Sequence, residues 1–183
     1  MMSFPRPESS VLVIVDLQER LLPVVAEPDA VVERSRILLE GALALGVDVL
    51  VTEQYPKGLG HTVPAIADLL SRSAETVEKT GFSAFAEPLF RTKLVATPKK
   101  TLIVAGIEAH ICVLQTVLDA LDDGFDVICV ADAVSSRKAE NRELALENMR
   151  RAGAQVLPVE SVLFMLLRDA KSPFFKTISQ LIR

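Results

Sequence analysis

Apolar residues recur along the chain at two spacings, which predict strands and helices in alternation. Short, nearly continuous apolar runs are typical of strands buried on both faces. We expect six of them, at 11–16, 47–52, 75–79, 101–106, 125–131 and 154–159, of which 75–79 has the weakest pattern. Longer segments with apolar residues three or four positions apart predict helices at 29–45, 87–95, 111–123, 139–152 and 161–168.

Three of these helices end at a glycine that stands directly before a strand, namely Gly46, Gly124 and Gly153. Glycine in this position adopts the left-handed conformation that ends a helix. Strands and helices in alternation imply a parallel sheet with right-handed crossovers. The sequence therefore predicts an α/β fold, a three-layer α/β/α sandwich with Rossmann-like topology and a parallel sheet of about six strands.

No linker or low-complexity segment divides the 183 residues. We therefore expect a single domain over residues 1–183, in which 1–9 and 172–183 form peripheral tails. For residues 173–183 the sequence leaves two alternatives open. This segment either packs as a last helix on its own chain or reaches a neighbouring subunit.

Composition narrows the range of functions. Half of the residues are hydrophobic, 5% are aromatic and none is tryptophan, which is typical of the aliphatic core of a sheet between helices. The net charge of −4 and the lack of a basic stripe argue against nucleic acid as the main partner. Two cysteines make no disulfide framework, and no segment has the pattern of a signal peptide or a membrane span. We expect a soluble cytoplasmic protein that does not bind membranes.

One of the two cysteines lies where a packing cysteine is not expected. In the predicted helix 111–123 the apolar face is formed by Val113, Leu114, Val117, Leu118 and Leu121, and the opposite face by Cys112, Gln115, Thr116 and Asp119. A free cysteine is usually a small buried hydrophobe, as we expect of Cys129 in strand 125–131. In the first turn of a helix, the backbone N–H groups and the helix dipole lower the pKa of a thiol. This position favours a reactive Cys112, with an inert thiol as the alternative.

Three polar residues follow the predicted strands at one edge of the sheet. Asp16 ends strand 11–16, Lys79 ends strand 75–79, and Cys112 comes shortly after strand 101–106. In open parallel sheets, ligands bind beyond the carboxyl ends of the strands. Taken singly, Asp16 could cap the next helix and Lys79 could be a solvated surface residue. Together they supply the proton acceptor and the positive charge that a thiolate nucleophile needs.

These residues lie in segments that resemble the isochorismatase-like cysteine hydrolases. The signature segments are VIVDLQ (13–18), EKTGFSAF (78–85) and GIEAHICV (106–113), and DAVSS (132–136) is similar to the segment after the family's fifth strand. The resemblance runs in order from about residue 10 to 160. The loop TEQYPKGLG (52–60) further resembles the subgroup of isochorismatase domain-containing proteins.

The resemblance implies a catalytic triad of Asp16, Lys79 and Cys112. It also implies a cis peptide bond between Ile107 and Glu108, and an oxyanion hole formed by the backbone N–H groups of Glu108 and Cys112. Around this centre we expect a substrate pocket lined by Gln18, Gln54, Tyr55, Phe82, Phe85 and His110. Family members form dimers or larger assemblies, so we also expect a homo-oligomer.

Differences between this sequence and other members of the family narrow the range of reactions that we expect. Isochorismatases proper lack the cysteine, so Cys112 favours attack on a small amide, ureido or ester-type substrate through a thioester. Nicotinamidases carry an Asp-x-His motif and a second histidine that bind a metal ion, whereas this chain has Glu53-Gln54-Tyr55 and only His61 downstream. We therefore expect neither a metal ion nor a cofactor. The alternative functions are a binding or assembly protein that keeps the fold without turnover and, more remotely, a nuclease.

Overall fold

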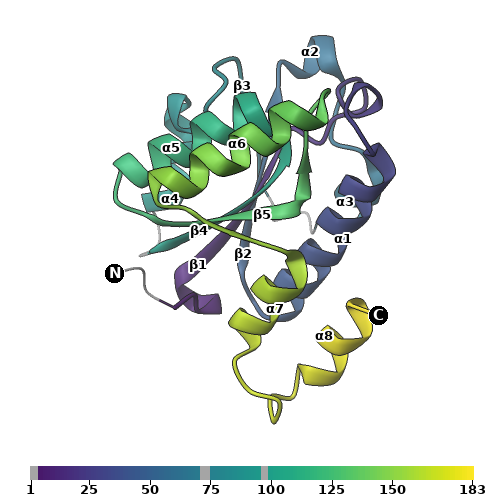
Figure 1. Cartoon of the computed structure of the whole chain (residues 1–183), viewed down its shortest axis with the longest axis vertical. Coiled ribbons are helices and arrows are strands. Elements are labelled where there is room, and N and C mark those ends of the chain that lie inside the picture. The colour runs from purple at the N-terminus through teal and green to yellow at the C-terminus, as the bar shows by residue number, and fades with distance from the viewer. Residues whose placement is uncertain (1–3, 71–74, 96–98) are drawn as a thin grey trace.

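The computed structural model describes residues 4–70, 75–95 and 99–183, which are built around a six-stranded sheet (Figure 1). All strand pairs are parallel, and the strand order is β3-β2-β1-β4-β5-β6. The strands are β1 (Ser10–Val15), β2 (Asp48–Gln54), β3 (Glu75–Lys79), β4 (Thr101–Ile107), β5 (Asp126–Ser135) and β6 (Gln155–Leu157). The predicted fold class is confirmed, including the six strands.

Helices cover both faces of the sheet (Figure 1). One face is covered by α1 (Pro28–Ala44), α3 (Pro64–Ala67), α7 (Val159–Leu167) and α8 (Phe175–Leu181), the other by α4 (Pro88–Val95), α5 (Leu114–Asp122) and α6 (Ala139–Ala152). The short α2 (Pro56–Leu59) follows β2. Successive side chains of a strand point to opposite faces. Accordingly, Leu12 and Ile14 of β1 join the first core, and Val11, Val13 and Val15 join the second.

The strand order places a topological switch point at the centre of the sheet. From β1 the chain moves outward through β2 and β3, and then returns to the other side of β1 for β4. The ends of β1 and β4 lie very close together. A Cβ at Gly106 would consequently lie only 2.0 Å from the carbonyl oxygen of Val15. Glycine is therefore required at the point where the chain leaves β4 toward Cys112. This is the edge at which ligands of open α/β sheets bind.

The helix predicted at 111–123 differs from the structure at its start. Residues Ala109–Val113 form a π-helical turn, in which the N–H of Val113 donates to the carbonyl of Glu108 at 3.2 Å, and α5 begins only at Leu114. The wider turn rotates the helix relative to the predicted face. Thr116 is consequently fully buried, and its hydroxyl oxygen accepts a hydrogen bond from the N–H of Ala84 at 3.0 Å. Cys112 also faces the core, so the predicted polar face was wrong for Cys112 and Thr116, whereas Gln115 is exposed as predicted.

Both ends of the chain have contacts with the rest of the protein. Helix α8 packs against α1, and Ile178 is fully buried in the core, so 173–183 forms a last helix on its own chain. Of the segment 1–9, residues 1–3 lie outside the described residues, and Phe4 lies beneath the guanidinium of Arg168 at 3.7 Å. In the part of the chain that the structure describes, no helix is both long and apolar enough to cross a membrane.

Candidate active site

Asp16 follows β1 directly, at the switch point. Its φ of 50° is unusual for a residue other than glycine, and strained backbone of this kind clusters at functional sites. The carboxylate is fully buried. One oxygen accepts from the hydroxyl of Thr52 at 2.7 Å, and the other accepts from Nζ of Lys79, also at 2.7 Å. The carboxylate is therefore committed to these two partners rather than to a helix N-terminus.

Lys79 ends β3 with a side chain that has no exposure to solvent. Besides Asp16, its ammonium donates to Oε1 of Gln54 at 2.7 Å and to the carbonyl oxygen of Phe82 at 3.0 Å, while the carbonyl oxygen of Gly81 lies at 3.3 Å. An ammonium has three protons, and these acceptors are enough to occupy all of them. Buried charges persist where they are paired and hydrogen-bonded in this way. Lys79 is thus not the solvated surface residue of the alternative interpretation.

Cys112 lies in the π-helical turn, 7% exposed, and its thiol is close enough to Asp16 and Lys79 for both to shift its pKa. Burial, together with the Asp16 carboxylate, raises the pKa of the Cys112 thiol to about 12, although the Lys79 charge opposes this shift. The sequence predicted a lowered pKa, which the structure contradicts. The prediction took the thiol to be on an exposed helix face, where burial would have no effect.

Cys129 provides the contrast that the sequence predicted. It is fully buried in β5 among apolar side chains, and burial likewise raises the pKa of its thiol to about 12. For Cys112 the causes of the shift include a carboxylate that can accept a proton and an ammonium that favours the thiolate. Only Cys112 therefore has the surroundings of a nucleophile.

The backbone beside Cys112 is fixed by the segment after β5. The peptide bond between Ile107 and Glu108 is cis, the geometry that the resemblance implies for it. The Glu108 carboxylate accepts from the backbone N–H and the Nε of Arg137 at 2.9 and 3.1 Å. The His110 ring shares a hydrogen bond of 2.9 Å with the hydroxyl of Ser136. These contacts fix the backbone that carries the two N–H groups of the expected oxyanion hole.

Two residues expected in the substrate pocket belong to the interior instead. Phe85 is almost fully buried and packs edge-to-face on Phe90 and Phe125, with ring centroids 5.3 and 6.0 Å apart. Gln18 is fully buried, and its side chain is bonded to the loop after β2. In both cases contacts inside the protein occupy the side chain, which corrects the expectation that it lines a pocket.

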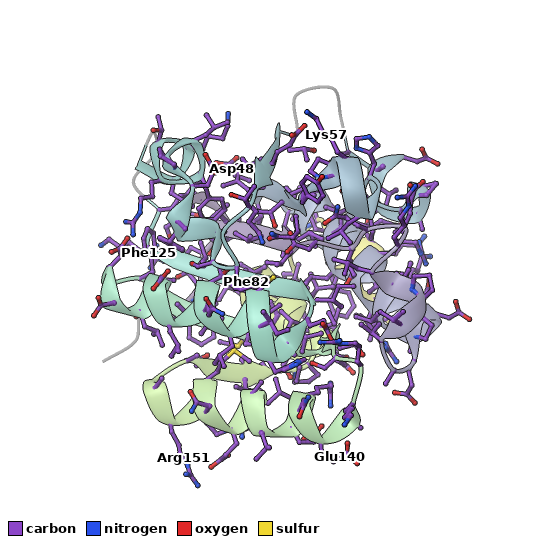
Figure 2. All side chains as sticks on the ribbon, turned by 90° about the horizontal axis from the view of Figure 1, so that it is seen from above. Asp48, Lys57, Phe82, Phe125, Glu140 and Arg151 are labelled. Carbon is purple, nitrogen blue, oxygen red and sulfur yellow. The ribbon has the colours of Figure 1, made fainter. Side chains whose placement is uncertain are left out.

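The other expected pocket residues lie at the surface of this edge. Tyr55 and Phe82 are each 55% exposed. In Figure 2, which views the molecule from above, Phe82 lies near the middle and Lys57 farther out. A cavity of about 350 Å³ lies beside the end of β3, lined by Tyr55, Pro56, Lys57, Glu78, Lys79, Thr80 and Glu87. Gln54 is half-buried against Lys79, and His110 is half-buried against Ser136.

The loop after β2 is held by an ion pair that the sequence did not predict. The buried Glu53 carboxylate accepts from the N–H and the hydroxyl of Thr62 at 2.7 and 2.8 Å, and lies 3.1 Å from Nδ1 of His61. Burial alone would raise the pKa of Glu53, but these hydrogen bonds lower it below its usual value. The pKa of His61 is raised by its hydrogen bond with Glu53. Among the described residues, no group of three or more His, Cys, Asp and Glu side chains is arranged to hold a metal ion.

Thr52 is a site residue that sequence reasoning missed. Its hydroxyl donates to the Asp16 carboxylate, and its carbonyl accepts from the Asp16 N–H at 3.1 Å. The signal was nevertheless present, because Thr52 is the polar last residue of the predicted strand 47–52. It therefore shares the edge that identified Asp16 and Lys79.

Comparison with known proteins identifies relatives of the whole chain. Residues 10–161 match the family model described as the isochorismatase domain. The secreted isochorismatase effector Isc1 of Phytophthora sojae is 41% identical over 180 residues, covering 97% of this chain and 86% of its own length. Isochorismatase domain-containing protein 2A of Mus musculus is 40% identical over 178 residues, covering 97% of this chain and 84% of its own.

Solved structures share the fold over nearly the full length. A structure described as the MAR1 ribonuclease of Caenorhabditis elegans has a TM-score of 0.94 and 38% identity, covering 98% of this chain and 92% of its own. The YcaC gene product of Escherichia coli, described as an octameric hydrolase of unknown specificity, has a TM-score of 0.91 and 28% identity, covering 97% and 88%.

Proposed function

Because the chain belongs to the isochorismatase family, we propose that it is a cysteine hydrolase with Asp16, Lys79 and Cys112 as its catalytic triad. Its substrate is a small amide, ureido or ester-type compound, and the reaction passes through a thioester on Cys112. The observation that carries this proposal is the fully buried pair of Asp16 and Lys79, 2.7 Å apart, which lies close enough to the Cys112 thiol for both charges to shift its pKa. No metal ion or cofactor is needed for this chemistry.

Charge balance explains how a thiol with a raised pKa can act as the nucleophile. With Asp16 and Lys79 ionised and the thiol neutral, the three side chains carry no net charge. Loss of the thiol proton to solvent would leave a buried negative charge, and this is why burial raises the pKa of Cys112. Transfer of the same proton to Asp16 leaves the net charge at zero. The thiolate then lies beside the Lys79 ammonium, which stabilises it.

The proposed cycle begins when the thiolate adds to the carbonyl carbon of the substrate. Negative charge develops on the carbonyl oxygen, where the N–H groups of Glu108 and Cys112 stabilise it. Asp16 returns its proton to the leaving amine or alcohol, the carbon–nitrogen or carbon–oxygen bond breaks, and a thioester remains. Water then attacks the thioester while Asp16 accepts a proton from it. The carbon–sulfur bond breaks, the departing sulfur takes this proton from Asp16, and the acid is released with the thiol restored.

The test is a screen of small amides, ureido compounds and esters with wild-type protein and the Cys112→Ala variant. We expect turnover by wild type alone, unaffected by a chelator. We also expect mass spectrometry of quenched reactions to detect the acyl group on the peptide that contains Cys112. Equal activity of the two proteins would contradict the proposal. Binding of a compound without turnover by either protein would favour the alternative, a binding protein that keeps the fold.

A second candidate function comes from the Caenorhabditis elegans structure, because its description names a ribonuclease. The net charge of −4 opposes tight binding to an RNA backbone, and we therefore rank this function below hydrolysis of a small molecule. Adding single-stranded RNA to the screen tests it. RNA cleavage that survives Cys112→Ala would favour a nuclease with a different catalytic centre.

We also propose that the protein is a homo-oligomer in the cytoplasm. Closed symmetric assemblies are common among soluble enzymes, and the Escherichia coli neighbour is described as octameric. Both cysteines are free, as a reducing compartment would keep them, although the Phytophthora sojae relative is described as secreted.

A further inference from the structure

The Lys79 ammonium has a second side-chain partner besides Asp16. Gln54 ends β2 directly opposite Lys79 in the register of β2 and β3. Its Oε1 accepts from Nζ of Lys79 at 2.7 Å, while its Nε2 donates to the carbonyl oxygen of Thr80, also at 2.7 Å. The bond to Thr80 sets the orientation of the amide, because only the NH₂ group can donate to a carbonyl. The amide oxygen is therefore aimed at the ammonium.

Gln18 holds Gln54 in place from the other side. The Nε2 of Gln18 donates to the carbonyl oxygens of Gln54 and Gly60 at 3.0 and 2.7 Å, and its Oε1 accepts from the Gln54 N–H at 2.7 Å. Both N–H bonds and the oxygen of this fully buried amide are thus in use. The end of β2 and the far end of the loop 55–60 are joined through one side chain.

We propose that Gln54 is a positioning residue that aims the Lys79 ammonium at Asp16 and Cys112, and that Gln18 positions Gln54. Without the Gln54 oxygen, the ammonium keeps Asp16 and the carbonyl oxygen of Phe82 as near acceptors and is free to turn toward that of Gly81 at 3.3 Å. A turned ammonium stabilises the Cys112 thiolate less. The inference rests on the proposed function, since it concerns the same thiolate.

The alternative is that Gln54 only holds the chain after β3 through Thr80. The two roles differ in what they do to the thiol. A positioning residue changes the amount of thiolate formed in the folded protein, whereas a purely structural residue changes only the free energy of unfolding. The experiment therefore measures the reactivity of Cys112 in protein that is shown to be folded.

The experiment follows the rate at which iodoacetamide alkylates Cys112 in the full-length protein, with mass spectrometry to distinguish it from Cys129. The variant is Gln54→Met, which has similar length and no amide. The matched control is Gln180→Met at an exposed position of α8. In Gln54→Met we expect alkylation to slow about tenfold across about pH 6 to 9, the effect of losing one hydrogen bond to a charged group. We expect Gln180→Met to react like wild type.

Further variants keep the inference open to contradiction. Gln54→Asn retains a polar amide but is one methylene too short to reach Lys79, so we expect a similar loss even if Gln54→Met does not fold. Gln18→Met should slow alkylation less, because the Gln54 side chain remains. A wild-type alkylation rate in folded Gln54→Met or Gln54→Asn would overturn this inference but not the proposed function. Wild-type protein in which Cys112 reacts no faster than Cys129 would contradict the proposed function instead.

Discussion

At the scale of single residues, the proposed triad distinguishes two kinds of proton loss that the sequence could not distinguish. Loss of the Cys112 proton to solvent is unfavourable, since burial and the Asp16 carboxylate raise the thiol pKa to about 12. Transfer of that proton to Asp16 conserves both the charge and the number of protons in the site. The reactivity of Cys112 should therefore report on Asp16 as much as on the thiol.

The first prediction concerns the pH dependence of that reactivity. In a Cys129→Ala background, alkylation of Cys112 should be nearly constant between about pH 6 and 9, because internal transfer to Asp16 leaves the proton count unchanged. In Asp16→Asn the thiolate forms only by loss to solvent, so the rate should rise about tenfold per pH unit below the thiol pKa. Turnover should fall roughly 10²- to 10⁴-fold in that variant. If the alkylation rate instead rises tenfold per pH unit in the protein that retains Asp16, then Asp16 does not accept the proton.

The sequence located the residues of the site better than it described their surroundings. Asp16 and Lys79 could be predicted because each stands at the end of a predicted strand, and parallel strands end at one edge of the sheet. The direction of the Cys112 pKa shift depends on burial, which involves residues distant in the sequence. The same holds for Gln18, whose partners are Gln54 at the end of β2 and Gly60 in the loop after it.

At the scale of elements, the helix predicted at 111–123 shows where periodicity alone is insufficient. A spacing of 3.6 residues per turn assigns the apolar face correctly only if the helix is regular from its start. The π-helical turn at Ala109–Val113 adds a residue to one turn, so Cys112 and Thr116 face the core while Leu114 and Leu118 are only partly buried. The other main helices have no such interruption, and their predicted bounds agree with the structure to within about two residues.

The second prediction tests this rotation through Thr116→Val. The replacement keeps the shape of the side chain but removes the acceptor for the buried N–H of Ala84. An unsatisfied buried donor costs about 1–3 kcal/mol, so we expect the free energy of unfolding in urea to fall by that amount. The control is Thr92→Val, whose hydroxyl bonds at the exposed face of α4 and which should change stability by less than about 0.5 kcal/mol. An equally small effect of Thr116→Val would contradict the rotated face.

At the scale of the whole molecule, the strand order explains why residues from distant segments meet. Among the strands that the structure describes, only β1 lies between two strands that both come later in the chain, and Asp16 follows β1 at this point. Lys79 reaches it across β2, and Cys112 comes from the turn after β4. Alternation of strands and helices predicted the layers, and the expected Rossmann-like topology corresponds to this strand order. The order depends on which helix packs on which face.

The last prediction concerns the association of the whole chain with further copies of itself. The evidence for it is a set of exposed aromatic side chains. Phe164, Phe174 and Phe175 of the α7 and α8 region are each more than a third exposed, as is Phe4 beside Arg168. Apolar side chains gathered at a surface favour burial against another subunit. Static light scattering at micromolar concentration should therefore give a mass of at least about 40 kDa, twice the 19.9 kDa of one chain. Replacing Phe174 and Phe175 by serine tests whether this region contributes to association, and we expect it to lower the measured mass. The control is Leu144→Ser on the exposed side of α6, which should leave the mass unchanged. A mass near that of one chain for the unmodified protein would contradict the prediction.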